Sequence, residues 1–211
     1  MKRALISLSA LSIAALPALA ETKDFPVGSF SSIDVNGGIK VLYETGAETT
    51  VIVEQAEGDF SDISIETDDG ELQIGRESLG FLKSLRANLH VDLVEGDLRV
   101  KVNGKRMPSY TVRVTSPSIS ELDVAQSSIL EASGIDAGKI ELDASSSAKL
   151  IVSGRAASAD MDASSSSSID ASDFIVGAIS IEATSSADVI AHAVTNSRAR
   201  IDASSSSDVK L

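Results

Sequence analysis

One short phrase returns five times in the C-terminal part of the chain, in forms such as ELDASSSAKLIVSG and RIDASSSSDVKL. An acidic residue in front of the serines marks each copy, at steps of 20, 19, 20 and 20 residues: Asp123, Asp143, Asp162, Glu182 and Asp202. A fixed period of about twenty residues predicts a stacked repeat architecture, because one such unit cannot bury its apolar face alone.

Apolar and polar residues alternate within each copy, which is the period-two pattern of a half-buried strand. Shifting by one copy keeps the same phase, so the apolar residues form rows. One row is large, Leu142, Met161, Ile181 and Ile201; a second is Leu150, Ile169, Val189 and Val209; a third is small, Ala144, Ala163, Ala183 and Ala203. We expect these rows to point inward.

The repeat predicts an all-β fold, a right-handed single-stranded parallel β-helix with about 20 residues per coil. Regular coils are expected over residues 116–211. Residues 21–115 keep the alternation but lose the period, so more irregular strands are expected there, either as first coils or as a sheet that caps them. Strands are expected at 89–93 and 98–102 with a turn at 94–97 between them, and a short helical turn at 81–85. A Pro at position 117 is expected to end one strand just before the first regular coil.

Serines fall between the two strand segments of each copy, as at 145–147 and 164–168, where hydroxyls can bond local backbone groups. We interpret these tracts as corners, because they are in phase with the core rows. O-glycosylation or a low-complexity linker is the other interpretation of such tracts.

The strand, small motif and second strand repeated every twenty residues resemble the head GIN domain of bacterial auto-transporter adhesins. The segments VRVTSPSISELDVAQSS (112–128) and FSSIDVNGGIKVLYETGAETTVIVE (30–54) also resemble that family. The resemblance implies a secreted, non-enzymatic β-helix that serves as an adhesive surface. The family's small motif is typically Gly-Ser-Gly, whereas this chain has Ser-Ser-Ser or Thr-Ser-Ser, so we expect its corners to avoid positive φ.

Residues 1–20 have the pattern of a secretory signal peptide: two cations, an apolar run and the small-residue ending Ala18-Leu19-Ala20. We expect cleavage there to leave residues 21–211 as one domain. The length and the absence of a stop-transfer pattern predict no membrane span. The expected location is the periplasm, the cell surface or the medium.

Charge limits the partners. The formal net charge is -13, which disfavours nucleic acid and anionic membrane surfaces. A surface glycan or an envelope protein remains possible as a partner. Residues 76–107 form a basic segment, interpreted either as internal charge balance or as a docking patch. Because the chain reaches Leu211 in strand phase, self-association through a sheet edge is also expected.

No catalytic, cofactor or metal site is predicted. His90 and His192 lie on separate strand patterns, and no nucleophile motif accompanies them. The alternatives are a carbohydrate-active β-helix enzyme of the polysaccharide lyase or hydrolase type, which would need clustered carboxylates beside cations and aromatic residues, and a purely structural or assembly protein. One further hypothesis is that calcium relieves repulsion within the acidic row Asp143, Asp162, Glu182 and Asp202.

Overall fold

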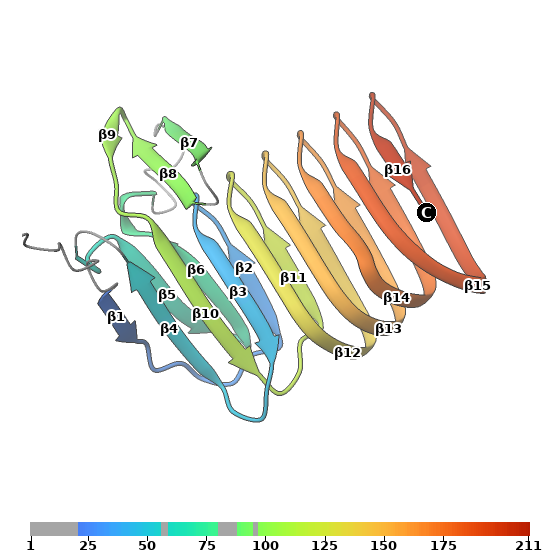
Figure 1. The fold of residues 1–211 in the computed structure, drawn as a ribbon, viewed down its shortest axis with the longest axis horizontal. Helices are drawn as coiled ribbons and strands as arrows, with labels where there is room; N and C mark the ends of the chain where they lie inside the picture. Colours follow the sequence, from blue (N-terminus) through green and yellow to red (C-terminus); the bar gives the residue numbers. More distant parts are fainter. Residues whose placement is uncertain (1–20, 56–58, 80–87, 95–96) are drawn as a thin grey trace, which may run out of the picture.

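The computed structural model describes residues 21–55, 59–79, 88–94 and 97–211. These residues are mostly in strands, with one short 3-10 turn, η1 (Glu77–Leu79), and no α-helix among them. The predicted all-β class is therefore confirmed. The large sheet curls so that its two arms lie on either side of a common core (Figure 1). The proposed signal peptide lies outside the described residues.

Four long strands and one short strand form the C-terminal half of the large sheet. They are β12 (Ile129–Ala144), β13 (Lys149–Ala163), β14 (Ser168–Ala183), β15 (Asp188–Ala203) and β16 (Asp208–Lys210). Each pairs with the next in parallel, so that Leu142 lies beside Met161, and Ile181 lies between Met161 and Ile201. These partners are 19 or 20 residues apart in the sequence, as the repeat predicts. The long strands bend near their middles and run along both arms (Figure 1).

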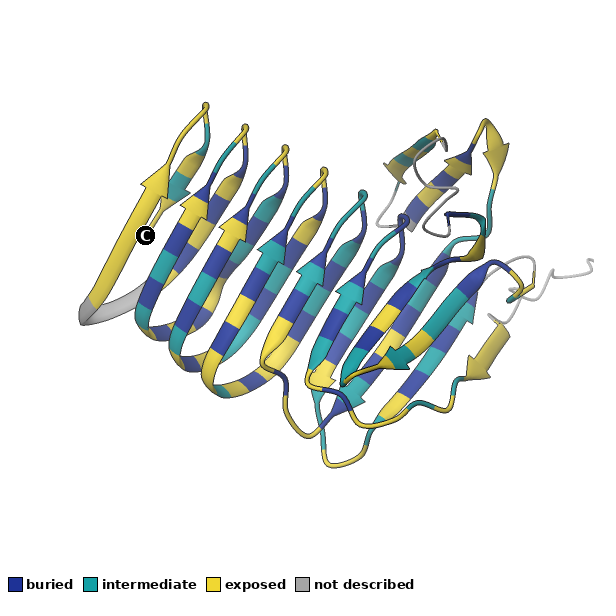
Figure 2. Cartoon of the chain, turned by 180° about the vertical axis from the view of Figure 1, so that it is seen from behind, coloured by how far each residue is buried: buried dark blue, intermediate teal, exposed yellow. Residues whose placement is uncertain are grey.

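The predicted inward rows form the C-terminal part of the core. Leu142, Met161 and Ile181 are buried, as are Leu150, Ile169 and Val189 and the first three alanines of the small row. Figure 2 shows buried residues alternating with intermediate or exposed ones along most strands of the large sheet. The last member of the large row is different, because Ile201 is 44% exposed. Among the described residues, the second half of β15 pairs only with β14, so one side of Ile201 lacks a covering strand.

The N-terminal strands continue both arms. On one arm, β11 (Glu121–Val124), β2 (Ser32–Val35) and β6 (Glu71–Arg76) follow β12 in parallel; on the other, β3 (Lys40–Thr45) and β10 (Tyr110–Ser116) do so. Antiparallel strands then complete the arms: β5 (Ile63–Asp68) on β6, β4 (Thr50–Gln55) on β10, and β1 (Glu21–Asp24) on β4. Within residues 21–115, parallel strands thus extend both arms of the sheet and antiparallel strands form their outer edges. Strand β10 ends directly before Pro117, as predicted.

A separate three-stranded sheet contains β7 (Leu89–Val94), β8 (Asp97–Val102) and β9 (Lys105–Arg106). The predicted strands at 89–93 and 98–102 are confirmed. Leu98, Val100 and Val102 are buried against Leu79 in a small second core. The predicted helical turn at 81–85 lies outside the described residues, and so do the central residues of the predicted turn at 94–97.

The serine corners correct one expectation. The second and third residues of each motif have positive φ, for example 54° at Ser146 and 64° at Ser147. Ala148 N donates to Ser145 O at 3.1 Å, which makes a tight turn of the kind with two left-handed central residues. Stacking explains how serine tolerates this backbone: Ser147 N donates to Ser165 O of the next corner at 3.0 Å. The corners therefore form a backbone hydrogen-bond ladder that offsets the conformational cost.

Candidate interaction face

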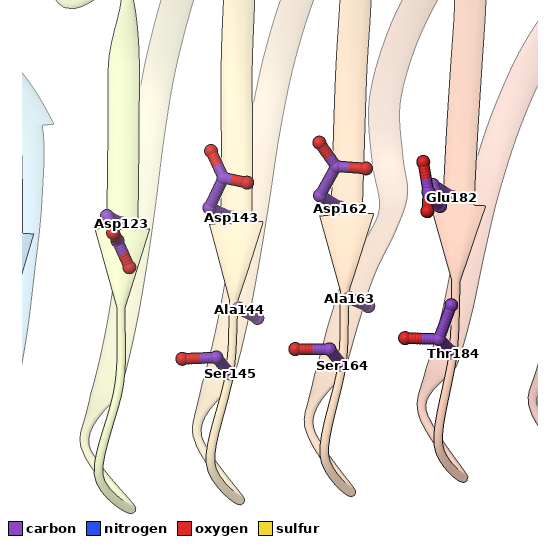
Figure 3. A pocket seen from close by; sticks show the side chains of 9 residues that line it. All are labelled: Asp123, Asp143, Ala144, Ser145, Asp162, Ala163, Ser164, Glu182 and Thr184. Atoms are coloured by element: carbon purple, nitrogen blue, oxygen red, sulfur yellow. The ribbon is translucent and has the colours of Figure 1, made fainter.

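A line of carboxylates crosses one arm of the large sheet. The strand register places six acidic residues side by side on adjacent strands, in the order Asp34, Asp123, Asp143, Asp162, Glu182 and Asp202. We call these six residues the carboxylate ladder. Figure 3 shows its four central members projecting from consecutive strands. The acidic row predicted from the sequence is therefore aligned in the structure.

Strand alternation explains why the ladder faces outward. Leu142 and Ala144 are buried on either side of Asp143 in the sequence, so the Asp143 side chain must leave the core. The same applies to each repeat. The repeat period does not identify Asp34 as a member of the ladder, because its segment lies outside the repeats. The only sequence signal is the short likeness between Ile33-Asp34-Val35 and Leu122-Asp123-Val124.

A shallow groove of about 390 Å³ lies along the ladder. Hydroxyl groups line it beside the carboxylates, in a second row formed by Ser145, Ser164 and Thr184 (Figure 3). A neighbouring hollow of about 370 Å³ shares three ladder residues and adds Glu141, Asp160 and Arg200 among its lining groups. The surface therefore offers repeated acceptors and hydroxyl groups at the spacing of adjacent strands, about 4.8 Å.

Four of the ladder carboxyls have raised pKa values. Partial burial is the main cause that raises the pKa of Asp123 to about 6, followed by the charges of Asp34, Glu121 and Glu71. Partial burial likewise raises the pKa of Asp143 to about 6, with Asp162 and Asp123 as the nearest contributing charges. The pKa values of Asp34 and Asp162 are also raised, again chiefly by burial. Loss of hydration and like charges both disfavour the ionised forms.

Counter-charges lie beside the ladder. Lys139 Nζ is 2.6 Å from a carboxylate oxygen of Glu141 and 3.1 Å from one of Asp160. Among the described residues, no ion pair includes a ladder carboxylate. The described ladder carboxylates therefore have no ion-pair partner, although Arg200 lines the neighbouring hollow beside Asp202.

The metal hypothesis gains no support from the geometry. In the part of the chain that the structure describes, no group of three or more His, Cys, Asp or Glu residues is placed to hold a metal ion. Asp143, Asp162, Glu182 and Asp202 lie in a line and do not converge on one point. The arrangement is a linear charged surface.

The two histidines are not brought together. His90 lies on β7 of the small sheet, where its Nε2 is 3.2 Å from an oxygen of Asp92. His192 lies on β15 of the large sheet, where it is exposed. The described residues thus provide no shared site for these two groups.

The described cations of the basic segment 76–107 do not form one patch. Arg76 is buried and paired with Asp62. In contrast, Arg99, Lys101 and Arg106 line a groove of about 400 Å³ on the small sheet, next to Leu93, which is 62% exposed. Internal charge balance accounts for Arg76, while the outer three cations stay open to solvent.

No helix among the described residues combines the length and apolar character needed to cross a bilayer. No curated protein matches the chain. Among solved structures, a putative adhesin from Bacteroides fragilis NCTC 9343 superposes with a TM-score of 0.57 and 11% identity, covering 92% of this chain and 98% of that one. A putative lipid binding protein from Parabacteroides distasonis ATCC 8503 gives a TM-score of 0.50 and 13% identity, covering 91% and 97%. At these identities the likeness concerns the fold.

A family model described as "Putative auto-transporter adhesin, head GIN domain" matches residues 29–211. This range includes nearly all the strands and the whole carboxylate ladder. The sequence resemblance is therefore confirmed over most of the chain. The chain belongs to the head GIN domain family of putative auto-transporter adhesins.

Proposed function

We propose that this chain is an exported, non-enzymatic interaction domain of the cell envelope, which binds its partner through the face that carries the carboxylate ladder. The observation that supports this most is the in-register line of carboxylates along a shallow groove. Such a face offers many equivalent weak contacts. A surface glycan or a basic envelope protein has the chemistry to use them, through hydroxyl or ammonium groups.

Rigidity favours this function. The ladder residues lie on strands whose inward neighbours, such as Leu142 and Met161, are fully buried. Binding therefore orders little of the backbone, which lowers its entropic cost. We also propose that the stacked segments wind as a right-handed parallel β-helix of about 20 residues per coil, with residues 21–211 as a single domain released from the signal peptide 1–20.

A binding screen of residues 21–211 tests the function. The protein is applied to a glycan array and to immobilised envelope fractions, with and without calcium. We expect a saturable interaction that weakens at least about tenfold, or 1.4 kcal/mol, in the variant Asp143→Asn/Asp162→Asn/Glu182→Gln. Neutral amides keep the shape of the side chains and remove their charge.

A matched control keeps this test specific. The variant Asp173→Asn/Asp188→Asn/Asp208→Asn removes three exposed carboxylates outside the ladder, and we expect it to bind like the natural chain. Equal loss in both variants would indicate a general charge effect and would contradict the assignment of the face. Absence of any saturable ligand would favour the structural or assembly role. Light scattering over a range of concentrations tests self-association through a sheet edge separately.

A further inference from the structure

The six strands that carry the carboxylate ladder come from separate parts of the sequence. The like charges of the ladder repel one another between adjacent strands. Its members occupy the same register position on six adjacent strands. Adjacent strands lie about 4.8 Å apart, a separation at which two like charges repel even in bulk water. The core rows on the other side of the same strands hold these charges together.

We propose that the carboxylate ladder is a pH-sensitive seam between successive repeats. At neutral pH its like charges oppose the stacking of the strands. At mildly acidic pH, protons held between neighbouring carboxyls change this repulsion into carboxyl to carboxylate hydrogen bonds, which tie each repeat to the next. This pH dependence needs no ligand, so it can be tested independently of the proposed interaction function.

The surroundings of the ladder favour proton uptake. The acidic groups that face its central members come from the neighbouring strands and from the same strands: Glu71 on β6, Glu121 on β11, Glu141 on β12, Asp160 on β13, and the ladder residues themselves. Lys139 is the basic group at this edge, and it is engaged with Glu141 and Asp160. Arg200 lines the neighbouring hollow beside Asp202. The balance at the central carboxyls is therefore strongly negative.

The direction of the effect follows from proton linkage. The pKa of Asp123 and of Asp143 is about 6 in the folded chain, compared with an ordinary value of 3.8. Between these values the folded state holds more protons than the unfolded state, so stability rises as the pH falls through this window. The loss of stability is fully present above about pH 6, and it disappears at pH values below the pKa of these carboxyls in the unfolded chain.

Two readouts test the seam. In a carboxyl carbon NMR titration of residues 21–211, we expect Asp123 and Asp143 to titrate with midpoints near 6. In thermal melts, we expect the midpoint temperature to be several degrees higher at about pH 5 than at about pH 7.5, since about 1 kcal/mol shifts it by roughly 2–4 °C in a domain of this size.

Matched variants separate the effect of the ladder on stability from the effect of net charge. Asp123→Asn/Asp143→Asn should lose at least half of the gain on acidification, whereas Asp173→Asn/Asp188→Asn should keep it. Titration midpoints near 3.8 for both ladder residues would overturn the proposal, as would an equal gain in all three proteins. If the ladder variant fails to fold, the NMR titration of the natural chain still decides.

Discussion

The guanidinium of Arg76 is buried and donates from Nη1 to Oδ2 of Asp62 at 2.7 Å. Two further donors of the same group reach backbone carbonyls, Nε to Gly37 O at 2.6 Å and Nη2 to Pro108 O at 2.9 Å. The face of the Tyr110 ring lies 5.1 Å from the guanidinium carbon. One side chain thus joins the end of β6 to three other segments at the N-terminal end of the sheet.

Removal of one partner of this buried pair should be costly. Asp62→Ala leaves the Arg76 charge without its carboxylate, and we expect a loss of about 3–5 kcal/mol in the free energy of unfolding. Urea denaturation measures it. The double variant Asp62→Ala/Arg76→Met should lose less than the two single losses added together, because it leaves no buried charge behind.

An exposed pair provides the comparison. Lys139 contacts Glu141 and Asp160, but its side chain is 57% exposed. Lys139→Ala should therefore lower the free energy of unfolding far less than Asp62→Ala does. A cost for Lys139→Ala equal to that for Asp62→Ala would mean that burial does not decide the strength of these pairs.

Gly154 is a position where no side chain fits. Its φ is 127°, and a Cβ there would lie 2.7 Å from Ile135 N and in contact with Ile135 O. These are backbone atoms of the neighbouring strand, which cannot move aside easily. We expect Gly154→Ala to destabilise the fold by about 3 kcal/mol, the upper end of the usual overpacking penalty, with a lower melting temperature as the readout.

Gly70 is the matched control for that substitution. It also has positive φ, 85°, but nothing lies within 4 Å of its ideal Cβ. Gly70→Ala should cost only the conformational preference, about 1 kcal/mol. Similar losses at the two positions would show that the close approach to Ile135 is unimportant.

Repetition explains which features the sequence could predict. The alternation around Leu142 recurs in each copy, so the inward rows and the outward acidic row follow from a period and a phase. Asp34 joins the same ladder through parallel pairing of β2 with β11, a contact between segments about ninety residues apart for which a likeness of three residues is the only sequence signal. The sequence does not predict the ion pair between Arg76 and Asp62 for the same reason. It occurs once, and a lone Arg in a basic segment resembles a surface charge.

The large inward row leads to a further prediction, about the size of its side chains. Met161 is 1% exposed and lies between Leu142 and Ile181. Met161→Ala should create a cavity and cost about 2–5 kcal/mol, measured by urea denaturation. Ile201→Ala, in the same row but at a 44% exposed position, should cost clearly less. Equal costs would contradict the finding that the last member of the row is only partly covered.

The serine corners allow a stabilising substitution. Ser146 and Ser147 hold φ of 54° and 64°, a backbone region that costs an ordinary L-residue about 1–2 kcal/mol. Their side chains are exposed, while the stacking bond to Ser165 O comes from the backbone of Ser147. Ser146→Asn/Ser147→Gly keeps that bond and supplies the residues that favour this turn, so we expect a gain of about 1 kcal/mol and a melting temperature roughly 2–4 °C higher. Ser147→Val should have the opposite effect, because a β-branched residue resists positive φ. A gain with Val, or a loss with Asn-Gly, would show that the hydroxyls and not the backbone conformation set the stability of the corner.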